Sequence, residues 1–246
     1  MTDPDLHARA DGVRIAYRHR PGRGPTLVFF PGYLSDMEGG KALALDAWAE
    51  RENRALLRFD YSGCGVSEGL FEDGTLARWR DDALELIDAV MRGPLVLVGS
   101  SMGGWLMLLV ALAVPKRVAG MAGIASAPDF TSWGFTDAQK AALVHDGFIT
   151  EPSEYSDEGY ITTRGFWESG EANILLGGEI AIDCPVRLLH GQRDDSVPFE
   201  LSLRLADALR SADVQTILVK DGDHRLSREG DIALLLATVG QLVDSL

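Results

Sequence analysis

Residues 95–114 read LVLVGSSMGGWLMLLVALAV and contain a G-x-S-x-G sequence between two apolar runs. The first run, Leu95–Val98, is typical of a buried strand, and the second, Gly104–Val114, is typical of a buried helix. A serine between two glycines at a strand-to-helix turn is the pattern of a nucleophile elbow. The spacing to both glycines selects Ser101 rather than Ser100, so the sequence predicts an activated serine at position 101.

The glycines of this motif have a steric reason, because the turn forces Ser101 into a strained backbone conformation that only very small neighbours at positions 99 and 103 tolerate. Met102 follows at the start of the helix, where the helix dipole is positive. We therefore expect the backbone N–H of Met102 to stabilise an oxyanion next to Ser101. The second oxyanion donor is expected from the loop after an early strand, where the N–H of Tyr33 follows Gly32.

A nucleophilic serine needs a base, and the base needs an orienting acid. Residues 186–198 read VRLLHGQRDDSVP, a predicted strand followed by a loop with two competing aspartates. The spacing H-G-x-x-D-x-x-V-P favours Asp194, with Asp195 as the alternative, and we expect His190 to be structural. His224 lies in a loop before the C-terminal helix, where the base is expected. The resulting order of Ser101, Asp194 and His224 is the triad order of α/β-hydrolases.

Apolar runs alternate with helical stretches through most of the chain, which predicts an α/β fold with a mostly parallel, doubly wound sheet and helices on both faces. The expected strands are residues 27–30, 55–59, 95–99, 118–124, 186–190 and 216–219, with Val13–Arg18 as an antiparallel edge strand. The expected helices are about 36–51, 75–91, 102–114, 199–209 and 229–246. In such a sheet the catalytic loops gather at the carboxyl ends of the strands.

Residues 128–183 interrupt this alternation, and we expect them to form a small helical lid. One short helix is predicted from Thr136 to about Asp146, with Gln139 completing a capping box and Gly147 ending the helix. The segment is rich in aromatic side chains, and an ordinary helical layer with its own core is the alternative to a lid. The substrate-binding residues predicted from it are Phe130, Trp133, Phe135, Phe148 and Trp167.

The composition fits one soluble domain over residues 1–246, with 46% hydrophobic and 24% charged residues. A net charge of −14 disfavours nucleic acid and anionic membranes as partners. No apolar run approaches the roughly 20 residues of a membrane-spanning helix. The N-terminal residues 1–11 are acidic and lack an apolar stretch, so we expect no signal or transit peptide and a cytoplasmic location.

Neither a metal nor a cofactor is expected. The histidines show no HxxxH spacing, and Gly63-Cys64-Gly65 lacks the third glycine of a dinucleotide-binding motif because Glu68 takes its place. Cys64 is not expected to be a nucleophile, since no strand-to-helix elbow presents it.

These motifs resemble those of the α/β-hydrolase domain-containing protein 10 group, which comprises mitochondrial palmitoyl-protein thioesterases and acyl-glucuronide esterases with bacterial relatives. The resemblance runs from about Leu27 to Leu242 and is most specific in PGYLS (31–35), RFDYSG (58–63), GSSMGGWLML (99–108), RLLHGQRDDSVP (187–198) and DHR (223–225). It implies an α/β-hydrolase fold, a triad of Ser101, Asp194 and His224, and cleavage of esters or thioesters.

We therefore predict a serine hydrolase that cleaves carboxylic esters, fatty-acyl thioesters or both through an acyl-enzyme on Ser101. The expected partner is a small acyl ester or thioester, and an acylated protein is a further candidate substrate. One alternative is a different reaction of the same triad, such as lactone or C–C bond hydrolysis. The other is a ligand-binding protein that has this fold but no catalytic activity.

Overall fold

The structure, a computed structural model, describes residues 3–151 and 159–246. Its main sheet has eight strands in the order β1-β2-β4-β3-β5-β6-β9-β10. The strands are β1 (Asp5–Ala8), β2 (Arg14–Arg20), β3 (Arg23–Phe30), β4 (Arg54–Phe59), β5 (Leu95–Ser100), β6 (Val118–Ile124), β9 (Val186–Gly191) and β10 (Val214–Val219). Pairing is antiparallel for β1 with β2 and for β2 with β4, and it is parallel in the rest of the sheet.

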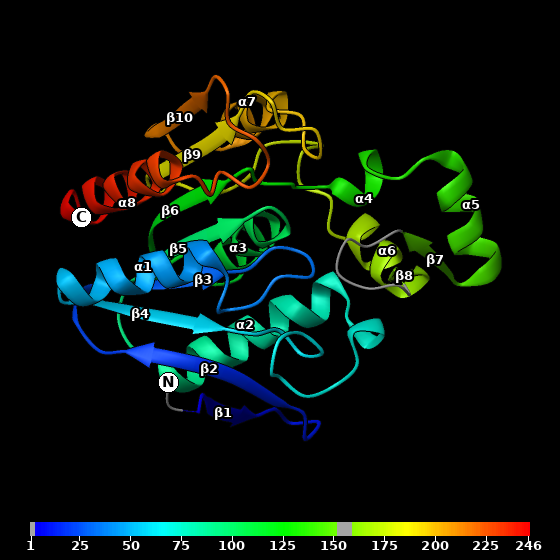
Figure 1. The fold of residues 1–246 in the computed structure, drawn as a ribbon, viewed down its shortest axis with the longest axis horizontal. Coiled ribbons are helices and arrows are strands. Elements are labelled where there is room, and N and C mark those ends of the chain that lie inside the picture. The colour runs from blue at the N-terminus through cyan, green and yellow to red at the C-terminus, as the bar shows by residue number, and fades with distance from the viewer. Residues whose placement is uncertain (1–2, 152–158) are drawn as a thin grey trace.

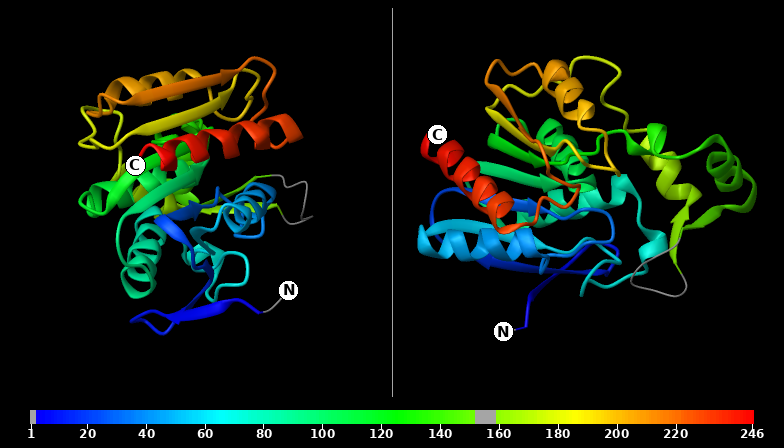
Figure 2. Two further views of the ribbon diagram at one scale, coloured as in Figure 1. Left: turned by 90° about the vertical axis from the view of Figure 1, so that its left-hand side faces the viewer. Right: turned by 45° about the horizontal axis from the view of Figure 1, so that its top comes forward.

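Helices cover both faces of this sheet (Figures 1 and 2). On one face lie α1 (Gly40–Arg51) and α8 (Glu229–Asp244), and on the other lie α2 (Leu76–Val90), α3 (Met102–Ala113) and α7 (Glu200–Ala208). All six residues of β5 are buried, which explains its continuous apolar sequence. The arrangement confirms the predicted doubly wound α/β architecture.

The expected edge strand is antiparallel, as predicted, but it does not lie at the edge. β1 pairs along β2 and forms the edge in its place. The sequence of β1, DLHA, has only four residues and is mostly exposed, so it is too short for its pattern to predict a strand.

The helices and strands of the 128–183 segment lie beyond the carboxyl ends of the parallel strands, to the right in Figure 1. Its elements are α4 (Phe130–Trp133), α5 (Asp137–Asp146), β7 (Phe148–Glu151), β8 (Tyr160–Thr163) and α6 (Arg164–Glu171), with β7 and β8 forming a separate antiparallel hairpin. The capping box of Thr136 and Gln139 and the helix end at Gly147 are confirmed. The expectation of a single helix is wrong, and residues 152–158 of the segment lie outside the described residues.

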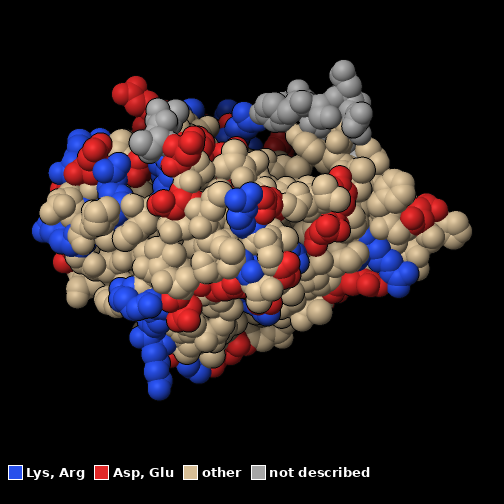
Figure 3. All heavy atoms as spheres, turned by 90° about the horizontal axis from the view of Figure 1, so that it is seen from below, with Lys and Arg blue, Asp and Glu red and all other residues tan. Residues whose placement is uncertain are grey.

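Charged side chains of both signs intermingle on the face of the molecule shown in Figure 3. Ion pairs among the described residues include Arg78 with Asp11 at 2.9 Å and Arg18 with Glu38 at 2.7 Å. Over the described ranges, none of the helices has the length and apolar character needed to cross a membrane.

Candidate active site

The turn between β5 and α3 places Ser101 in a backbone conformation that is rare for any residue other than glycine, with φ 54° and ψ −121°. Packing explains the two flanking glycines. A Cβ atom at Gly99 would lie 2.4 Å from the carbonyl oxygen of Gly103, and one at Gly103 would lie 2.1 Å from the carbonyl oxygen of Phe30. Either methyl group would push the turn apart, so the strained serine depends on both glycines.

The three residues predicted as the triad come together, although they lie on three separate loops. The Oγ of Ser101 is 3.1 Å from Nε2 of His224, and Nδ1 of His224 is 2.8 Å from Oδ2 of Asp194. The neutral Nδ1–H form of His224 satisfies both contacts, because it donates to the carboxylate and accepts from the serine hydroxyl. This is the geometry in which an imidazole can remove the proton of a serine.

Asp194 and its sequence neighbour differ sharply in environment. The Asp194 side chain is fully buried, and its Oδ1 accepts hydrogen bonds from the N–H groups of Ser196 and Val197. Burial by itself raises the pKa of Asp194, but hydrogen bonds from His190, His224 and the N–H of Val197 outweigh it and hold that pKa well below its usual range. Asp195 is exposed, and its carboxylate contacts the hydroxyl of Ser196.

The loop after β3 approaches the nucleophile from the other side. A Cβ atom at Gly32 would lie 3.4 Å from Cβ of Ser101, so the backbone of this loop passes directly beside the serine. Tyr33, the predicted second donor, is the next residue. Met102, the predicted first donor, begins α3.

The ring of Tyr33 belongs to an aromatic cluster that joins this loop to the 128–183 segment. Its centroid lies 5.1 Å from that of Phe166 in α6 and 6.1 Å from that of Phe130 in α4. The Tyr33 hydroxyl is 3.1 Å from Oγ1 of Thr162, a buried residue of β8. The sequence did not predict that Phe166 or Thr162 contacts Tyr33, because contacts between segments about 130 residues apart leave no local pattern.

The five predicted substrate-binding aromatics do not all lie together. Phe130 contacts the rings of Tyr33 and Phe135, whereas the Trp133 indole N–H donates to the carbonyl oxygen of Pro128. Phe148 is half exposed beside α5 and lines a shallow outer hollow. Trp167 lies on α6, and its buried indole nitrogen has no hydrogen-bond partner among the described residues.

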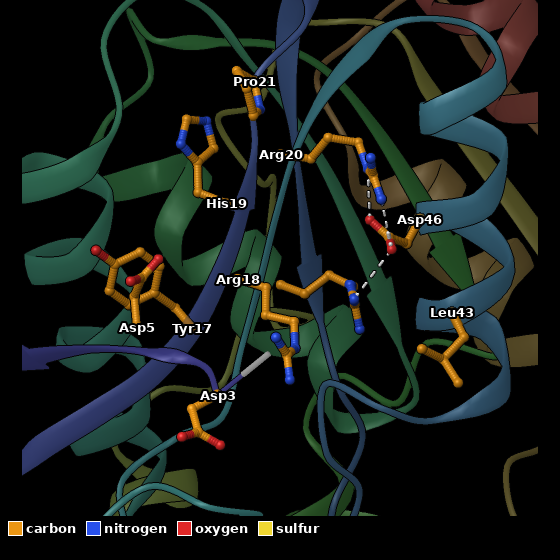
Figure 4. Close-up of a pocket in the computed structure, with 10 residues that line it drawn as sticks. Asp3, Asp5, Tyr17, Arg18, His19, Arg20, Pro21, Leu43 and Asp46 are labelled. Atoms are coloured by element: carbon orange, nitrogen blue, oxygen red, sulfur yellow. Dashed lines mark hydrogen bonds and ion pairs between the residues drawn. The ribbon is translucent and has the colours of Figure 1, made fainter. Parts of the chain in front are cut away.

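Two further features of the described residues do not belong to this chemistry. Burial raises the pKa of the Cys64 thiol to about 12, so it is not a reactive thiolate. A charged hollow of about 560 Å³ lies between β2 and α1 and contains none of the triad residues. Figure 4 shows it, with Arg20 paired to Asp46 at 2.9 Å.

Comparison with known proteins places this chain in a family. The family model described as "alpha/beta hydrolase fold" matches residues 25–154. A human protein named "Palmitoyl-protein thioesterase ABHD10, mitochondrial" is 43% identical over 242 residues, which cover 97% of this chain and 79% of that protein. The solved structure of mouse α/β-hydrolase domain-containing protein 10 superposes with a TM-score of 0.91 at 40% identity and covers 99% of both chains.

A bacterial structure is equally similar. The chain matches a putative hydrolase from Agrobacterium vitis S4 with a TM-score of 0.91 and 40% identity, covering 98% of this chain and 100% of that one.

The cytoplasmic location expected from the sequence is contradicted by these comparisons. The relatives from human, cattle and mouse, at 42–43% identity, are named as mitochondrial proteins, so the cytoplasmic location expected for this chain does not stand. The expectation rested on the character of residues 1–11 alone, a local pattern that does not outweigh relatives matching 97% of the chain.

The family model, the human relative and the mouse structure all agree with the α/β-hydrolase fold of this chain. The chain therefore belongs to the α/β-hydrolase family and, within it, is a hydrolase of the ABHD10 group.

Proposed function

We propose that Ser101, His224 and Asp194 are the nucleophile, base and acid of this enzyme. The chain is a hydrolase of ester or thioester bonds. The observation that carries the assignment of residues is the unbroken line of contacts from Ser101 Oγ through the His224 ring to Asp194 Oδ2, at 3.1 Å and 2.8 Å.

In the first half of the reaction, His224 takes the proton of Ser101 as Oγ attacks the acyl carbonyl carbon. The N–H groups of Met102 and Tyr33 donate to the oxyanion, and the leaving alcohol or thiol receives the proton from His224. In the second half, His224 activates a water molecule, which releases the carboxylic acid and regenerates Ser101. Asp194 stabilises the imidazolium formed in each half and fixes the tautomer of the neutral ring.

The proposed acyl site lies along the aromatic side chains of the 128–183 segment, which acts as the lid of a single domain spanning residues 1–246. Phe130 supports this placement most directly, since its ring contacts Tyr33 beside the oxyanion loop. The curated relatives carry the name palmitoyl-protein thioesterase. We infer that this chain also accepts long fatty-acyl groups, on small thiols and alcohols or on an acylated protein.

The acyl preference can be measured on p-nitrophenyl esters. We expect kcat/KM to increase from acetate to at least octanoate, by up to about fourfold for each methylene, because burying one CH₂ contributes about 0.8 kcal/mol. Thioesters with the same acyl groups should also be cleaved. Phe130→Ala should flatten the increase, whereas Phe148→Ala, which truncates a half-exposed ring, should change it less. A steady decrease from acetate onward would mean that the aromatic rings close the acyl site, and it would contradict the fatty-acyl assignment.

The pH dependence tests the base. His224 must be neutral to accept a proton, so we expect kcat/KM to increase between about pH 5 and 8, the range in which histidine side chains generally change their charge. Hydrogen bonds from His190 and His224 keep the pKa of Asp194 well below this range in spite of its burial, so Asp194 stays ionised. The acid limb, which is the rise of kcat/KM on the acid side of the pH profile, should therefore reflect the loss of a single proton. A flat profile between pH 5 and 9, with chemistry shown to limit the rate, would contradict a histidine base.

A further inference from the structure

Asp194 contacts a second imidazole. His190, the last but one residue of β9, has a fully buried side chain, and its Nε2 lies 3.1 Å from Oδ2 of Asp194. The same nitrogen lies 3.0 Å from the carbonyl oxygen of Val197. On the other side of the ring, Nδ1 lies 2.7 Å from the hydroxyl of Ser202, a fully buried residue of α7.

These partners determine which nitrogen of His190 carries a proton. A carbonyl oxygen and a carboxylate oxygen can only accept, so Nε2 must be the N–H donor toward Val197 and Asp194. In the neutral ring, Nδ1 is then an acceptor, and the Ser202 hydroxyl donates to it. This form satisfies all three contacts without placing a cation in the interior, where an added charge costs free energy.

We propose that His190 is a positioning residue that Ser202 holds in its Nε2–H form and that fixes the carboxylate of Asp194 for His224. This inference rests on the proposed function, because it assigns Asp194 the role of the triad acid. His190 itself does not touch the reacting atoms.

The geometry explains what such a residue contributes. Backbone N–H groups of Ser196 and Val197 hold Oδ1 of Asp194, and the His190 ring holds Oδ2 from one side. These contacts prevent rotation of the carboxylate. Oδ2 then stays in place as the acceptor for Nδ1 of His224, at 2.8 Å. The extra donor also disperses the negative charge of Asp194, which weakens its attraction for a proton on His224.

Substitution of His190 should therefore change the rate and the pH profile together. We expect His190→Leu to lower kcat roughly tenfold to a hundredfold, the loss that corresponds to one hydrogen bond to a charged group. With one donor fewer, the Asp194 carboxylate stabilises the His224 imidazolium more strongly, so half-maximal kcat/KM should move to higher pH. His190→Gln, whose amide can donate to Asp194 and accept from Ser202, should recover part of both effects.

A merely structural role makes a different prediction. If His190 only filled space, preparations of its variants would contain a smaller fraction of folded protein. Their kcat per active site and their acid limb would not change. Active sites are therefore counted by fluorophosphonate labelling. His7→Gln is the matched control, since Nε2 of His7 contacts the carboxylate of Glu85 at 3.2 Å on a different part of the sheet. It should leave both kcat and the acid limb unaltered.

Ser202→Ala provides a second variant that removes only one hydroxyl group. Without a donor to Nδ1, one buried nitrogen of His190 is left unpaired and the ring is held less firmly against Asp194, so kcat should decrease and the acid limb should move in the same direction as in His190→Leu. The other ionisable groups of the neighbouring loops and of α1, which are Arg193, Asp195, Asp223, Arg225 and Lys41, are the same in both variants. Unchanged kcat per active site and an unchanged acid limb in both variants would overturn the proposal.

The tautomer can also be observed directly in the unsubstituted enzyme by ¹⁵N NMR of histidine-labelled protein. We expect the signal of His190, identified by sequential assignment of the labelled protein, to show a proton on Nε2 and none on Nδ1 at the pH of maximal activity. A proton on Nδ1 would overturn the proposal even if the His190 variants failed to fold. Failure of the proposed function would look different, because the unsubstituted enzyme would then not react with the fluorophosphonate.

Discussion

Ser101→Ala is expected to lower kcat by on the order of 10⁶-fold, the loss found when the nucleophile of a Ser-His-Asp triad is removed. Labelling by a fluorophosphonate should disappear with it, because the hydroxyl that attacks the phosphorus is gone. The fold should survive, since alanine meets the same backbone strain at φ 54° as serine does. Hydrolysis of p-nitrophenyl octanoate, with thermal unfolding as the check on folding, measures both.

Ser100→Ala is the control for this experiment. Ser100 is the last residue of β5 and lies one position before the turn, so its loss should leave most of the activity. An inactive Ser100→Ala variant together with an active Ser101→Ala variant would mean that the register of the elbow is wrong.

Asp194→Asn should lower kcat by roughly 10⁴-fold through the wrong histidine tautomer. The structure gives the reason why the amide would orient unfavourably. The backbone N–H groups of Ser196 and Val197 require an acceptor at the Oδ1 position, so the amide oxygen stays there and the NH₂ group faces His224. The imidazole would then have to accept a hydrogen bond at Nδ1 and carry its own proton on Nε2. A protonated Nε2 cannot take the proton of Ser101.

The matched control is Asp195→Asn. Its carboxylate is exposed and contacts only the Ser196 hydroxyl among the described contacts, so kcat should stay within a few-fold of the unsubstituted enzyme. A large loss in Asp195→Asn with a small loss in Asp194→Asn would reassign the acid.

The parts of the molecule that the sequence predicted are those in which a local pattern determines the structure. The elbow around Ser101 needs its glycines within a few residues of each other, and β5 and α3 are apolar throughout. The helix between Thr136 and Gly147 carries both of its end signals in the sequence. By contrast, β1 and the β7–β8 hairpin have only four residues per strand, and long-range pairing decides their conformation.

The candidate site divides in the same way. The order of Ser101, Asp194 and His224 and the loop context of each could be inferred from motifs. The contact of His190 with Asp194 could not, because the motif does not show that the turn after β9 brings these two side chains together. The contact of His190 with Ser202 depends on how α7 packs against the end of β9. The contact of Tyr33 with Thr162 likewise depends on how the 128–183 segment folds back over the strand ends.

The central claim is that hydrolysis passes through an acyl-enzyme on Ser101, and trapping that intermediate tests it most directly. The enzyme is mixed with excess p-nitrophenyl octanoate, quenched in acid within the first turnover, digested and analysed by tandem mass spectrometry. We predict an octanoyl group on Ser101, appearing together with a burst of p-nitrophenol, and no adduct in His224→Ala. An octanoyl group on Ser100, Cys64 or Cys184 instead, or rapid turnover without any acylated peptide, would contradict the account.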